Sequence, residues 1–435
     1  MKLIESYTAI ADAGGDETLR AMQDALLIET LVYASERSPY YRERLGDTTG
    51  VKGVEDIGML PITRRAELQK DNWSLLCVDR KDIAEVVATT GTTGEPLFIA
   101  LTAADMQRLA ENERRWFSAM GVTGESIAQV AVTMDNLFVA GMAYYKGLES
   151  LGAGVVRSGA SNAKRQLELL MRIKPDIIIA VPSFMLKLAR EAEKLGLAPD
   201  SLEKALLIGE TIRGMDMASN HLGRLVEEAW NIECFSTYGI TEASVAFAEC
   251  ASHDGFHSHP DFVFPEILDG DGCSVPDGEA GELVVTTFQV EGMPLVRYGT
   301  GDICFKVEGP CRCGSETPRI GPVIGRKAQK LKVKGTTVYP GAIENALLKA
   351  DGVVNCHITA YTGEAGTDLV RVVVGTNGDS AEVLKEARSF VRADARLTPD
   401  IEVATPEEVE RLLSEGGSRK KAVFKDERKR AGAFD

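Results

Sequence analysis

A short loop rich in glycine and threonine is the first part of the sequence whose composition points to chemistry. It follows a predicted strand at Val86–Ala88 and ends at Glu95-Pro96. Backbone N–H groups and threonine hydroxyls in such a loop can surround phosphate oxygens. The loop lacks the G-x-x-x-x-G-K-[ST] spacing of a P-loop, so a polar turn between two strands is the alternative interpretation. The candidate phosphate-binding residues are Thr89, Thr90, Gly91, Thr92, Thr93 and Gly94.

Three cysteines and a histidine form the second chemical pattern. Cys250 precedes His257, and one residue separates Cys311 from Cys313. Thiolates and an imidazole are ligands that Zn²⁺ takes in tetrahedral structural sites, although neither pair has the common C-x₂-C spacing. The spacing alone leaves buried or solvated thiols as the alternative.

Several further segments resemble, in the correct order, motifs of the adenylate-forming superfamily, which includes acyl-CoA synthetases, adenylation domains and luciferases. The glycine–threonine loop is similar to the phosphate loop of that superfamily. The other segments resemble its adenine-side turn, its Tyr-Gly-x-Thr-Glu motif, its Arg-Tyr-x-Thr-x-Asp stretch and its hinge region. They are Gly209-Glu210-Thr211, Tyr238-Gly239-Ile240-Thr241-Glu242, Arg297-Tyr298-Gly299-Thr300-Gly301-Asp302, and Gly325-Arg326 with Lys334-Gly335, Tyr339-Pro340 and Ile343-Glu344.

Within the superfamily the sequence resembles the phenylacetate-CoA ligase group, over about residues 55 to 435. The matching segments include Leu60-Pro61-Ile62-Thr63, Glu249-Cys250 with Gly255-Phe256-His257, Phe264-Pro265-Glu266-Ile267, and Cys311-Arg312-Cys313-Gly314 before Pro318-Arg319-Ile320-Gly321. Members that keep the cysteine and histidine segments together look like zinc binders. The resemblance therefore implies a structural zinc site with four protein ligands. His259 is an alternative to His257, and His253 is a weaker candidate.

The resemblance implies that residues 89–94 hold the β- and γ-phosphates of ATP. An acidic chain must bind polyphosphate with backbone dipoles and hydroxyls, which agrees with this role. One departure lies beside the loop: members of the family usually carry a lysine where this sequence has Glu95. A carboxylate there would repel phosphate unless it points away.

The other motifs bring further implied roles. Glu242 resembles the glutamate that holds Mg²⁺ on the phosphates, and a hard carboxylate oxygen suits that cation. Tyr238 resembles the ring that stacks on adenine, and Asp302 resembles the carboxylate that accepts the ribose hydroxyls. Arg326 resembles the arginine between ribose and phosphate. The usual hinge aspartate is replaced by Lys327-Ala328-Gln329, so no hinge residue is named. The remaining implied nucleotide-binding residues are Gly209, Glu210, Thr211, Gly239 and Thr241.

The catalytic lysine of the family neutralises charge on the substrate carboxylate and the α-phosphate. In this sequence a basic tail from Ser418 to Phe424 occupies its place. Lys421 is the preferred candidate and Lys420 the second, and a solvated basic tail is the alternative.

The pattern of elements around these motifs predicts an α/β fold. Thr18–Arg44 has helical periodicity, and apolar β-branched runs alternate with helices from Ile83 to about Ala248. This alternation predicts βαβ units and a parallel sheet with ligands at the carboxyl ends of its strands. After Cys250, short strands such as Glu282–Thr287 and Pro294–Tyr298 predict a small β-rich subdomain. We expect an N-terminal domain over 1–325, with its β-rich part at about 250–325, and a small, mobile α+β domain over 326–435.

The composition excludes several classes of protein. The chain has 435 residues, 65 acidic against 49 basic ones, and a formal net charge of −16. General binding to nucleic acid or to an anionic membrane is not expected from such a surface. The apolar run Ile177–Val181 is far shorter than the roughly 20 residues of a membrane span. No export signal is visible, and eight cysteines in a long chain indicate reduced thiols, so we expect a cytoplasmic protein.

The leading hypothesis is an ATP- and Mg²⁺-dependent ligase that forms an acyl-adenylate from an aryl or arylalkyl carboxylate and transfers the acyl group to coenzyme A. The acid is not readable, because Asp135-Asn136-Leu137-Phe138 replaces the usual aromatic–glycine stretch. Two alternatives stay open: an adenylating synthetase with a different acceptor, and a non-catalytic nucleotide-binding relative. The resemblance also implies a homodimer.

Overall fold

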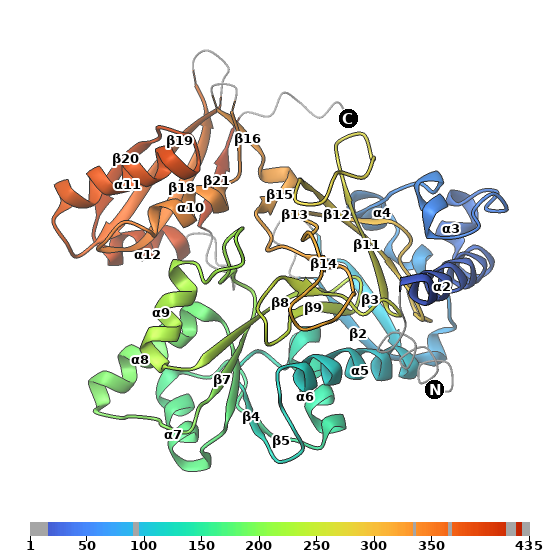
Figure 1. Ribbon diagram of the computed structural model, residues 1–435, viewed down its shortest axis with the longest axis horizontal. Helices are drawn as coiled ribbons and strands as arrows, with labels where there is room; N and C mark the ends of the chain where they lie inside the picture. Colours follow the sequence, from blue (N-terminus) through green and yellow to red (C-terminus); the bar gives the residue numbers. More distant parts are fainter. Residues whose placement is uncertain (1–15, 90–94, 334–335, 364–367, 415–422, 429–435) are drawn as a thin grey trace. The chain divides into compact units, whose positions relative to one another are not determined.

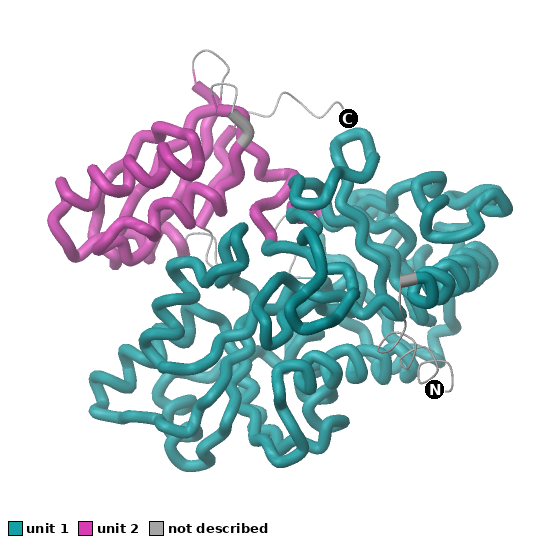
Figure 2. Tube along the Cα trace, in the orientation of Figure 1, with its two compact units in different colours: residues 1–300, 304–322 teal, residues 301–303, 323–435 magenta. Residues whose placement is uncertain are grey.

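The computed structural model describes residues 16–89, 95–333, 336–363, 368–414 and 423–428. The chain divides into two compact units (Figure 2). Unit 1 comprises residues 1–300 and 304–322, and unit 2 comprises residues 301–303 and 323–435. The division at Pro322 and Val323 lies close to the boundary that we predicted after residue 325.

The N-terminal region with predicted helical periodicity, Thr18–Arg44, is helical and consists of two helices. Helix α2 (Asp16–Arg37) ends before Pro39, which is the first residue of α3 (Pro39–Arg44). Proline lacks the N–H that a continuous helix would need, but it is well suited to the first helical position. Ser38 caps the new helix, because its hydroxyl accepts a hydrogen bond from the backbone N–H of Tyr41 at 3.2 Å.

The largest sheet of unit 1 has eight strands in the order β14-β10-β9-β8-β7-β6-β4-β5 (Figure 1). The strands from β5 to β8 pair in parallel, and β9, β10 and β14 continue the sheet in antiparallel fashion. The predicted parallel sheet is therefore confirmed for this part of the chain. Its strands are β4 (Ile127–Val130), β5 (Gly154–Arg157), β6 (Ile177–Ala180), β7 (Lys204–Leu207), β8 (Glu233–Ile240), β9 (Val245–Glu249), β10 (Phe256–His257) and β14 (Arg319–Ile320).

Helices cover both faces of the parallel strands, which explains why the central strand β6 is apolar and buried along its whole length. Ile177 and Ile179 of β6 pack in the same core as residues of α5 and α6. Ile178 and Ala180 point the other way, into a core with residues of α7, α8 and α9. The helices are α5 (Ala103–Ala119), α6 (Val139–Leu151), α7 (Ala163–Ile173), α8 (Pro182–Leu195) and α9 (His221–Trp230).

Two expectations for unit 1 were wrong. The run Val86–Ala88 belongs to β2 (Ile83–Ala88), which pairs antiparallel with β3 (Phe98–Thr102) and not with the parallel sheet. The glycine–threonine loop thus joins two antiparallel strands. Pro294–Tyr298 is also not a strand, because Arg297 has a left-handed backbone (φ 45°) and β13 (Tyr298–Phe305) begins after it.

The geometry of Arg297 explains this break in the chain. Its buried guanidinium donates to both carboxylate oxygens of Glu266, at 2.9 and 3.1 Å. It also donates to the carbonyl oxygens of Gly58 and Leu60, at 3.2 and 2.6 Å. The turn therefore aims Arg297 into the unit just before β13, which forms a second sheet in the order β1-β13-β12-β11, with β15 beside β13. The other strands are β1 (Thr63–Arg64), β11 (Val263–Leu268), β12 (Ala280–Thr287) and β15 (Gly325–Arg326).

Unit 2 is a separate α+β unit with its own core. Its main sheet has the order β20-β19-β18-β21, and β16 (Leu331–Val333) pairs with β17 (Thr336–Val338). The α/β fold class is confirmed. None of the described helices is long and apolar enough to cross a membrane. The remaining elements are α10 (Pro340–Leu347), β18 (Val353–Thr362), β19 (Asp368–Thr376), α11 (Ser380–Asp394), β20 (Asp400–Ala404), α12 (Pro406–Ser414) and β21 (Phe424–Glu427).

A buried acid on α5 makes the stability of this fold depend on pH. Burial raises the pKa of Glu113 to about 7, although Asn112 Nδ2 donates to its Oε1 at 3.0 Å. Between its ordinary pKa and about pH 7 the unfolded chain loses this proton while the folded chain keeps it, so the free energy of unfolding falls as pH rises. We expect Glu113→Gln to stabilise the protein at pH 8 by roughly 1–3 kcal/mol and much less at pH 5.

Urea unfolding at the two pH values measures this difference. Glu228→Gln, on the exposed side of α9, is the control and should change stability little at either pH. A gain in the Glu113 variant that is equal at pH 5 and pH 8 would contradict the assignment of a neutral buried acid.

Candidate nucleotide and metal sites

The predicted adenine-side turn follows β7 directly. Gly209 has a left-handed backbone (φ 78°), which a residue with a side chain rarely adopts. The Glu210 carboxylate accepts hydrogen bonds from the backbone N–H and the hydroxyl of Ser183, both at 2.8 Å. The carbonyl of Thr211 accepts from Asn220 Nδ2 at 2.8 Å. Glu210 therefore ties the predicted adenine-side turn to the beginning of α8.

The Tyr-Gly-x-Thr-Glu segment crosses from β8 to β9. Tyr238 is half-buried on β8, with its ring centroid 6.1 Å from that of Phe247 on β9. Gly239 lies on the same strand, and Thr241 and Glu242 follow its end. The Tyr238 ring thus lies on the part of β8 that extends past the last residue of β7.

Glu242 lies at a junction of three segments that are distant in the sequence. Its Oε1 accepts hydrogen bonds from Arg65 Nη1 at 2.7 Å and from the Tyr298 hydroxyl at 2.9 Å. The Glu242 side chain is only 12% exposed. A carboxylate at this junction, beside the glycine–threonine loop, offers the oxygen ligands that a divalent cation prefers.

Arg65 is the residue of this junction that the sequence reasoning missed. It opens α4 (Arg65–Lys70), and its Nη2 donates to the Thr89 hydroxyl at 2.8 Å and, more weakly, to the Glu95 carbonyl at 3.4 Å. Its Nε is buried without a hydrogen-bond partner among the described residues. The available signal was its place just after the matched segment Leu60-Pro61-Ile62-Thr63.

The two ends of the glycine–threonine loop are held while its centre lies outside the described residues. The Thr89 hydroxyl accepts from the backbone N–H of Leu97 at 3.0 Å. The Glu95 carbonyl accepts from Gln69 Nε2 at 2.7 Å, and the Glu95 residue is exposed. The predicted phosphate-binding residues Thr90, Gly91, Thr92, Thr93 and Gly94 all belong to the undescribed part.

Unit 2 carries the predicted ribose-binding pair. Asp302 and Arg326 are register partners of β13 and β15, and Arg326 Nε lies 3.2 Å from Asp302 Oδ1. The Asp302 side chain is 16% exposed and that of Arg326 is 49% exposed. Their charges therefore meet at the surface of unit 2. Lys420 and Lys421 lie outside the described residues; Val423, whose carbonyl accepts from Ile358 N at 2.8 Å, follows them.

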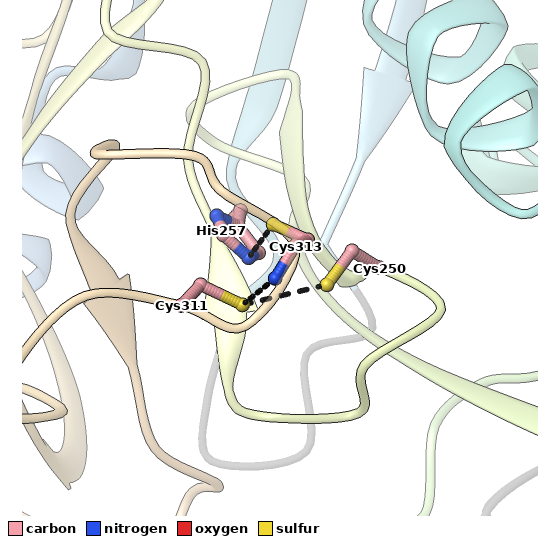
Figure 3. A group of neighbouring side chains, drawn as sticks. All are labelled: Cys250, His257, Cys311 and Cys313. Carbon is pink, nitrogen blue, oxygen red and sulfur yellow. Dashed lines mark hydrogen bonds between the residues drawn. The ribbon is translucent and has the colours of Figure 1, made fainter.

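The four predicted metal ligands come together on the β-rich part of unit 1 (Figure 3). Their ligand atoms all lie within 4.8 Å of one another. Cys250 Sγ is 3.6 Å from Cys311 Sγ, and Cys313 Sγ is 3.7 Å from His257 Nε2. A tetrahedron with Zn–S bonds of 2.3 Å has edges of about 3.8 Å, so the set fits Zn²⁺.

The surroundings of the cluster also suit a metal site. His257 Nδ1 is 2.8 Å from the Thr317 hydroxyl, a contact that leaves Nε2 directed at the thiols. Burial and the nearby Arg319 charge lower the pKa of His257 to about 4, which keeps the ring neutral as a metal ligand must be. Backbone N–H groups of Ser252 and Ser315 approach the sulfurs of Cys250 and Cys313, both at 3.4 Å.

The structure separates the other two candidate histidines from this cluster. His259 stacks on Trp116 with ring centroids 3.9 Å apart, and burial holds its pKa well below the usual range. His253 Nδ1 is 3.0 Å from Glu249 Oε2 and its Nε2 is 3.2 Å from Glu233 Oε1. Neither His259 nor His253 belongs to the group of ligand atoms, so the structure brings His257, and not His259, to the three thiols.

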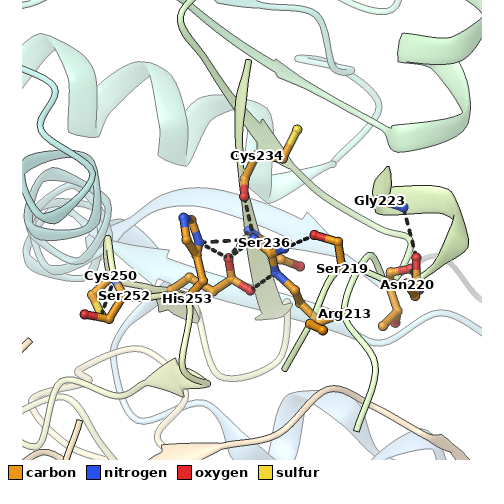
Figure 4. A network of polar contacts seen from close by, with 12 residues as sticks. Arg213, Ser219, Asn220, Gly223, Cys234, Ser236, Cys250, Ser252 and His253 are labelled. Carbon is orange, nitrogen blue, oxygen red and sulfur yellow. Dashed lines mark hydrogen bonds and ion pairs between the residues drawn. The ribbon is translucent and has the colours of Figure 1, made fainter. Parts of the chain in front are cut away.

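A buried polar network centred on Arg213, two residues after the predicted adenine-side turn, joins several segments of unit 1 (Figure 4). Arg213 Nε and Nη2 donate to the two carboxylate oxygens of Glu249 at 2.7 and 2.9 Å. Nη2 also donates to the Cys234 carbonyl at 2.6 Å, and Nη1 donates to the Ser219 hydroxyl. The side chains of Arg213 and Glu249 are 5% and 1% exposed.

Comparisons with known proteins support the resemblance that the motifs predicted. The family model described as AMP-binding enzyme matches residues 18–292. A phenylacetate-coenzyme A ligase of Thermus thermophilus is 34% identical over 88% of this chain and 87% of its own length. One of Pseudomonas putida is 32% identical over 86% of each chain. A crystal structure of 2-hydroxyisobutyryl-CoA ligase in the postadenylation state has a TM-score of 0.81 at 21% identity, covering 95% of this chain and 90% of its own.

The likeness to the crystal structure shows the fold alone, whereas the family match and the relatives above 30% identity cover most of the chain. The chain belongs to the family of AMP-binding enzymes, the adenylate-forming superfamily, and within it to the phenylacetate-CoA ligase group.

Proposed function

We propose that the protein is an ATP-dependent acid–CoA ligase. A carboxylate oxygen of the acid attacks the α-phosphorus of ATP, pyrophosphate leaves, and an acyl-adenylate remains. The thiol of coenzyme A then attacks the acyl carbonyl, and AMP leaves. The observation that carries this proposal is the junction of Arg65, Glu242 and Thr89 at the base of the loop, in a chain of this family.

We assign an aryl or arylalkyl acid as the substrate because the relatives of highest similarity reported above are phenylacetate-coenzyme A ligases. The expected acid-binding segment has its own geometry here. Asn136 and Leu137 both have left-handed backbones (φ 57° and 60°), and the Leu137 carbonyl accepts from the Ala88 N–H at 2.9 Å beside the loop. If this turn lines the acid site, that site would present a different surface from one lined by an aromatic–glycine stretch.

In the adenylation step each charged residue has a distinct role. Glu242 would hold Mg²⁺ on the phosphates, and Arg65 would turn from Glu242 to the phosphate oxygens as the cation binds. Arg65 would thereby provide the positive charge that Glu95 does not. Asp302 would accept the ribose hydroxyls, Tyr238 would stack on adenine, and Lys421 or Lys420 would neutralise the reacting carboxylate and α-phosphate.

The cysteine–histidine cluster would hold a structural Zn²⁺. Four protein ligands would fill the coordination sphere of the metal. The metal would therefore hold together the loop after β9, the strand β10 and the segment before β14. A cytoplasmic location and a homodimer remain predictions from the sequence.

The proposed reaction is tested by pyrophosphate release from Mg-ATP with aromatic, arylalkyl and aliphatic acids, each with and without coenzyme A. We expect multiple turnovers only when an aryl or arylalkyl acid and coenzyme A are both present. Turnover that needs the acid but not coenzyme A would mean that the acyl group is transferred to a different acceptor. If no acid leads to pyrophosphate release although ATP binds measurably, the protein would be a nucleotide-binding relative without ligase activity.

The role of Arg65 predicts a loss of nucleotide affinity on substitution. Arg65→Met should raise the Kd for Mg-ATP by about 10- to 100-fold, since a hydrogen-bonded charge on the phosphates is lost. Calorimetry measures this change. Arg64→Met is the matched control, because Arg64 pairs with Glu282 rather than with Glu242.

A second substitution separates the charge from the local packing. Glu95→Lys in the Arg65→Met background should recover part of the affinity, because it returns a cation next to the loop. Equal Kd values for the wild type and the Arg65 variant would refute the phosphate role of Arg65.

The zinc assignment predicts a metal content of about one ion per chain. Cys313→Ser should abolish zinc retention and lower the Tm by roughly 4 °C or more, as measured by elemental analysis and calorimetry. Cys273→Ser, at an exposed thiol outside the cluster, should change neither value. Wild-type protein that takes up no zinc from buffered Zn²⁺, or a Cys313 variant that keeps it, would exclude the site.

A further inference from the structure

The adenine-side turn lies beyond the last ladder contact that connects β7 to β8. The final register pair of these strands is Leu207 with Ser236. Gly209 lies two residues after Leu207, and Tyr238 lies two residues after Ser236. In the described structure no β7–β8 register pair connects these two positions. Parallel strands that run past their last ladder bond are free to diverge, so another interaction must fix the distance between the turn and the Tyr238 ring.

Arg213 makes that interaction. It follows the turn by two residues, and its guanidinium reaches the Cys234 carbonyl on β8 and both oxygens of Glu249 on β9. Glu249 Oε2 in turn accepts from the backbone N–H of Ser236 at 3.1 Å. The fork of one arginine therefore joins the loop after the turn to two adjacent strands: Cys234 lies within the β7–β8 ladder, and Glu249 holds Ser236, the last residue of that ladder.

The other supports of the turn lead elsewhere. Glu210 holds it to Ser183 at the beginning of α8, and Asn220 holds the Thr211 carbonyl to the beginning of α9. Both contacts fix the turn to helices and not to the strand that carries Tyr238. Among the hydrogen bonds described for the segment 209–213, those of Arg213 are the ones that reach β8 and, through Glu249, β9; Ile212 adds an apolar contact in the core that contains Cys234.

We propose that Arg213 is a positioning residue for nucleotide binding, which sets the backbone of the Gly209–Thr211 turn at the correct distance from Tyr238 to recognise the adenine edge. This inference rests on the proposed function, because it takes the turn as the adenine-binding element. Arg213 itself is buried and saturated by protein partners, so it acts through the turn and not by touching the nucleotide.

The test compares Arg213→Lys with Arg115→Lys in the full-length protein. Lysine keeps the charge but loses the bidentate fork. Arg115 is a matched control: it makes a bidentate pair with Asp261 at 2.8 and 2.9 Å, with side chains 6% and 0% exposed, and its described hydrogen bonds go to Asp261 and Glu111. If Arg213→Lys does not fold, the double variant Arg213→Met/Glu249→Gln removes both charges and leaves neither one buried alone.

Calorimetry with Mg-ATP and Mg-GTP provides the readout that a merely structural role would not move. We expect Arg213→Lys to weaken ATP binding about tenfold and to reduce the ATP-over-GTP preference by a similar factor, since base discrimination depends on placed hydrogen-bonding groups. The kcat at saturating ATP should change less than about threefold, because the reacting groups are not moved. Arg115→Lys should keep the wild-type preference even where it lowers the Tm.

Retention of ATP affinity and base preference by Arg213→Lys would overturn the inference, as would an equal loss of preference in Arg115→Lys. Hydrogen exchange at the amides of residues 209–211 tests, independently of nucleotide binding, whether Arg213 holds the turn in place. Exchange should be faster in Arg213→Lys than in Arg115→Lys. Wild-type protein that does not bind ATP would instead refute the proposed function. The exchange data would still support or contradict the claim that Arg213 holds the turn in place.

Discussion

The contact between Arg65 and Glu242 is the interaction on which the proposed nucleotide site in unit 1 depends. A chain with a net charge of −16 must bind polyphosphate beside a carboxylate, which is unfavourable unless a cation lies at the same place. Arg65 provides that cation, with one nitrogen on Glu242 and another on the Thr89 hydroxyl. The Tyr298 hydroxyl completes the junction. Because these residues come from separate segments, the same contact that balances charge also fixes the start of α4 against β2 and β13.

The alternating strands and helices of the parallel sheet could be predicted because each strand is recognisable from its own residues. A buried parallel strand needs a short run of β-branched residues, and Ile177–Ala180 reads in this way without knowledge of its neighbours. The errors arose where long-range contacts decide the structure. Val86–Ala88 has the composition of a strand, but its pairing partner follows the loop and not a crossover helix. Arg297 interrupts an apolar run because its guanidinium donates hydrogen bonds to the Glu266 carboxylate and to the carbonyl oxygens of Gly58 and Leu60.

The candidate metal site and the candidate nucleotide site differ in how far the sequence reveals them. Cysteines at defined spacing are rare enough to nominate Cys250, Cys311 and Cys313, but the sequence could not choose between His257 and His259. The choice follows from packing, since the His259 ring is stacked on Trp116. Arg65 and Arg213 carried no motif of their own. Their importance appears only when the fold brings Glu242 to the first and Glu249 to the second.

The central claim is that the acid is activated as an adenylate, and isotope transfer from the acid tests it most directly. A carboxylic acid labelled with ¹⁸O in both oxygens is turned over with ATP and coenzyme A, and the products are analysed by mass spectrometry. Attack of the carboxylate on the α-phosphorus predicts AMP that carries one ¹⁸O, with unlabelled pyrophosphate. Unlabelled AMP, or ADP together with labelled inorganic phosphate, would contradict the account.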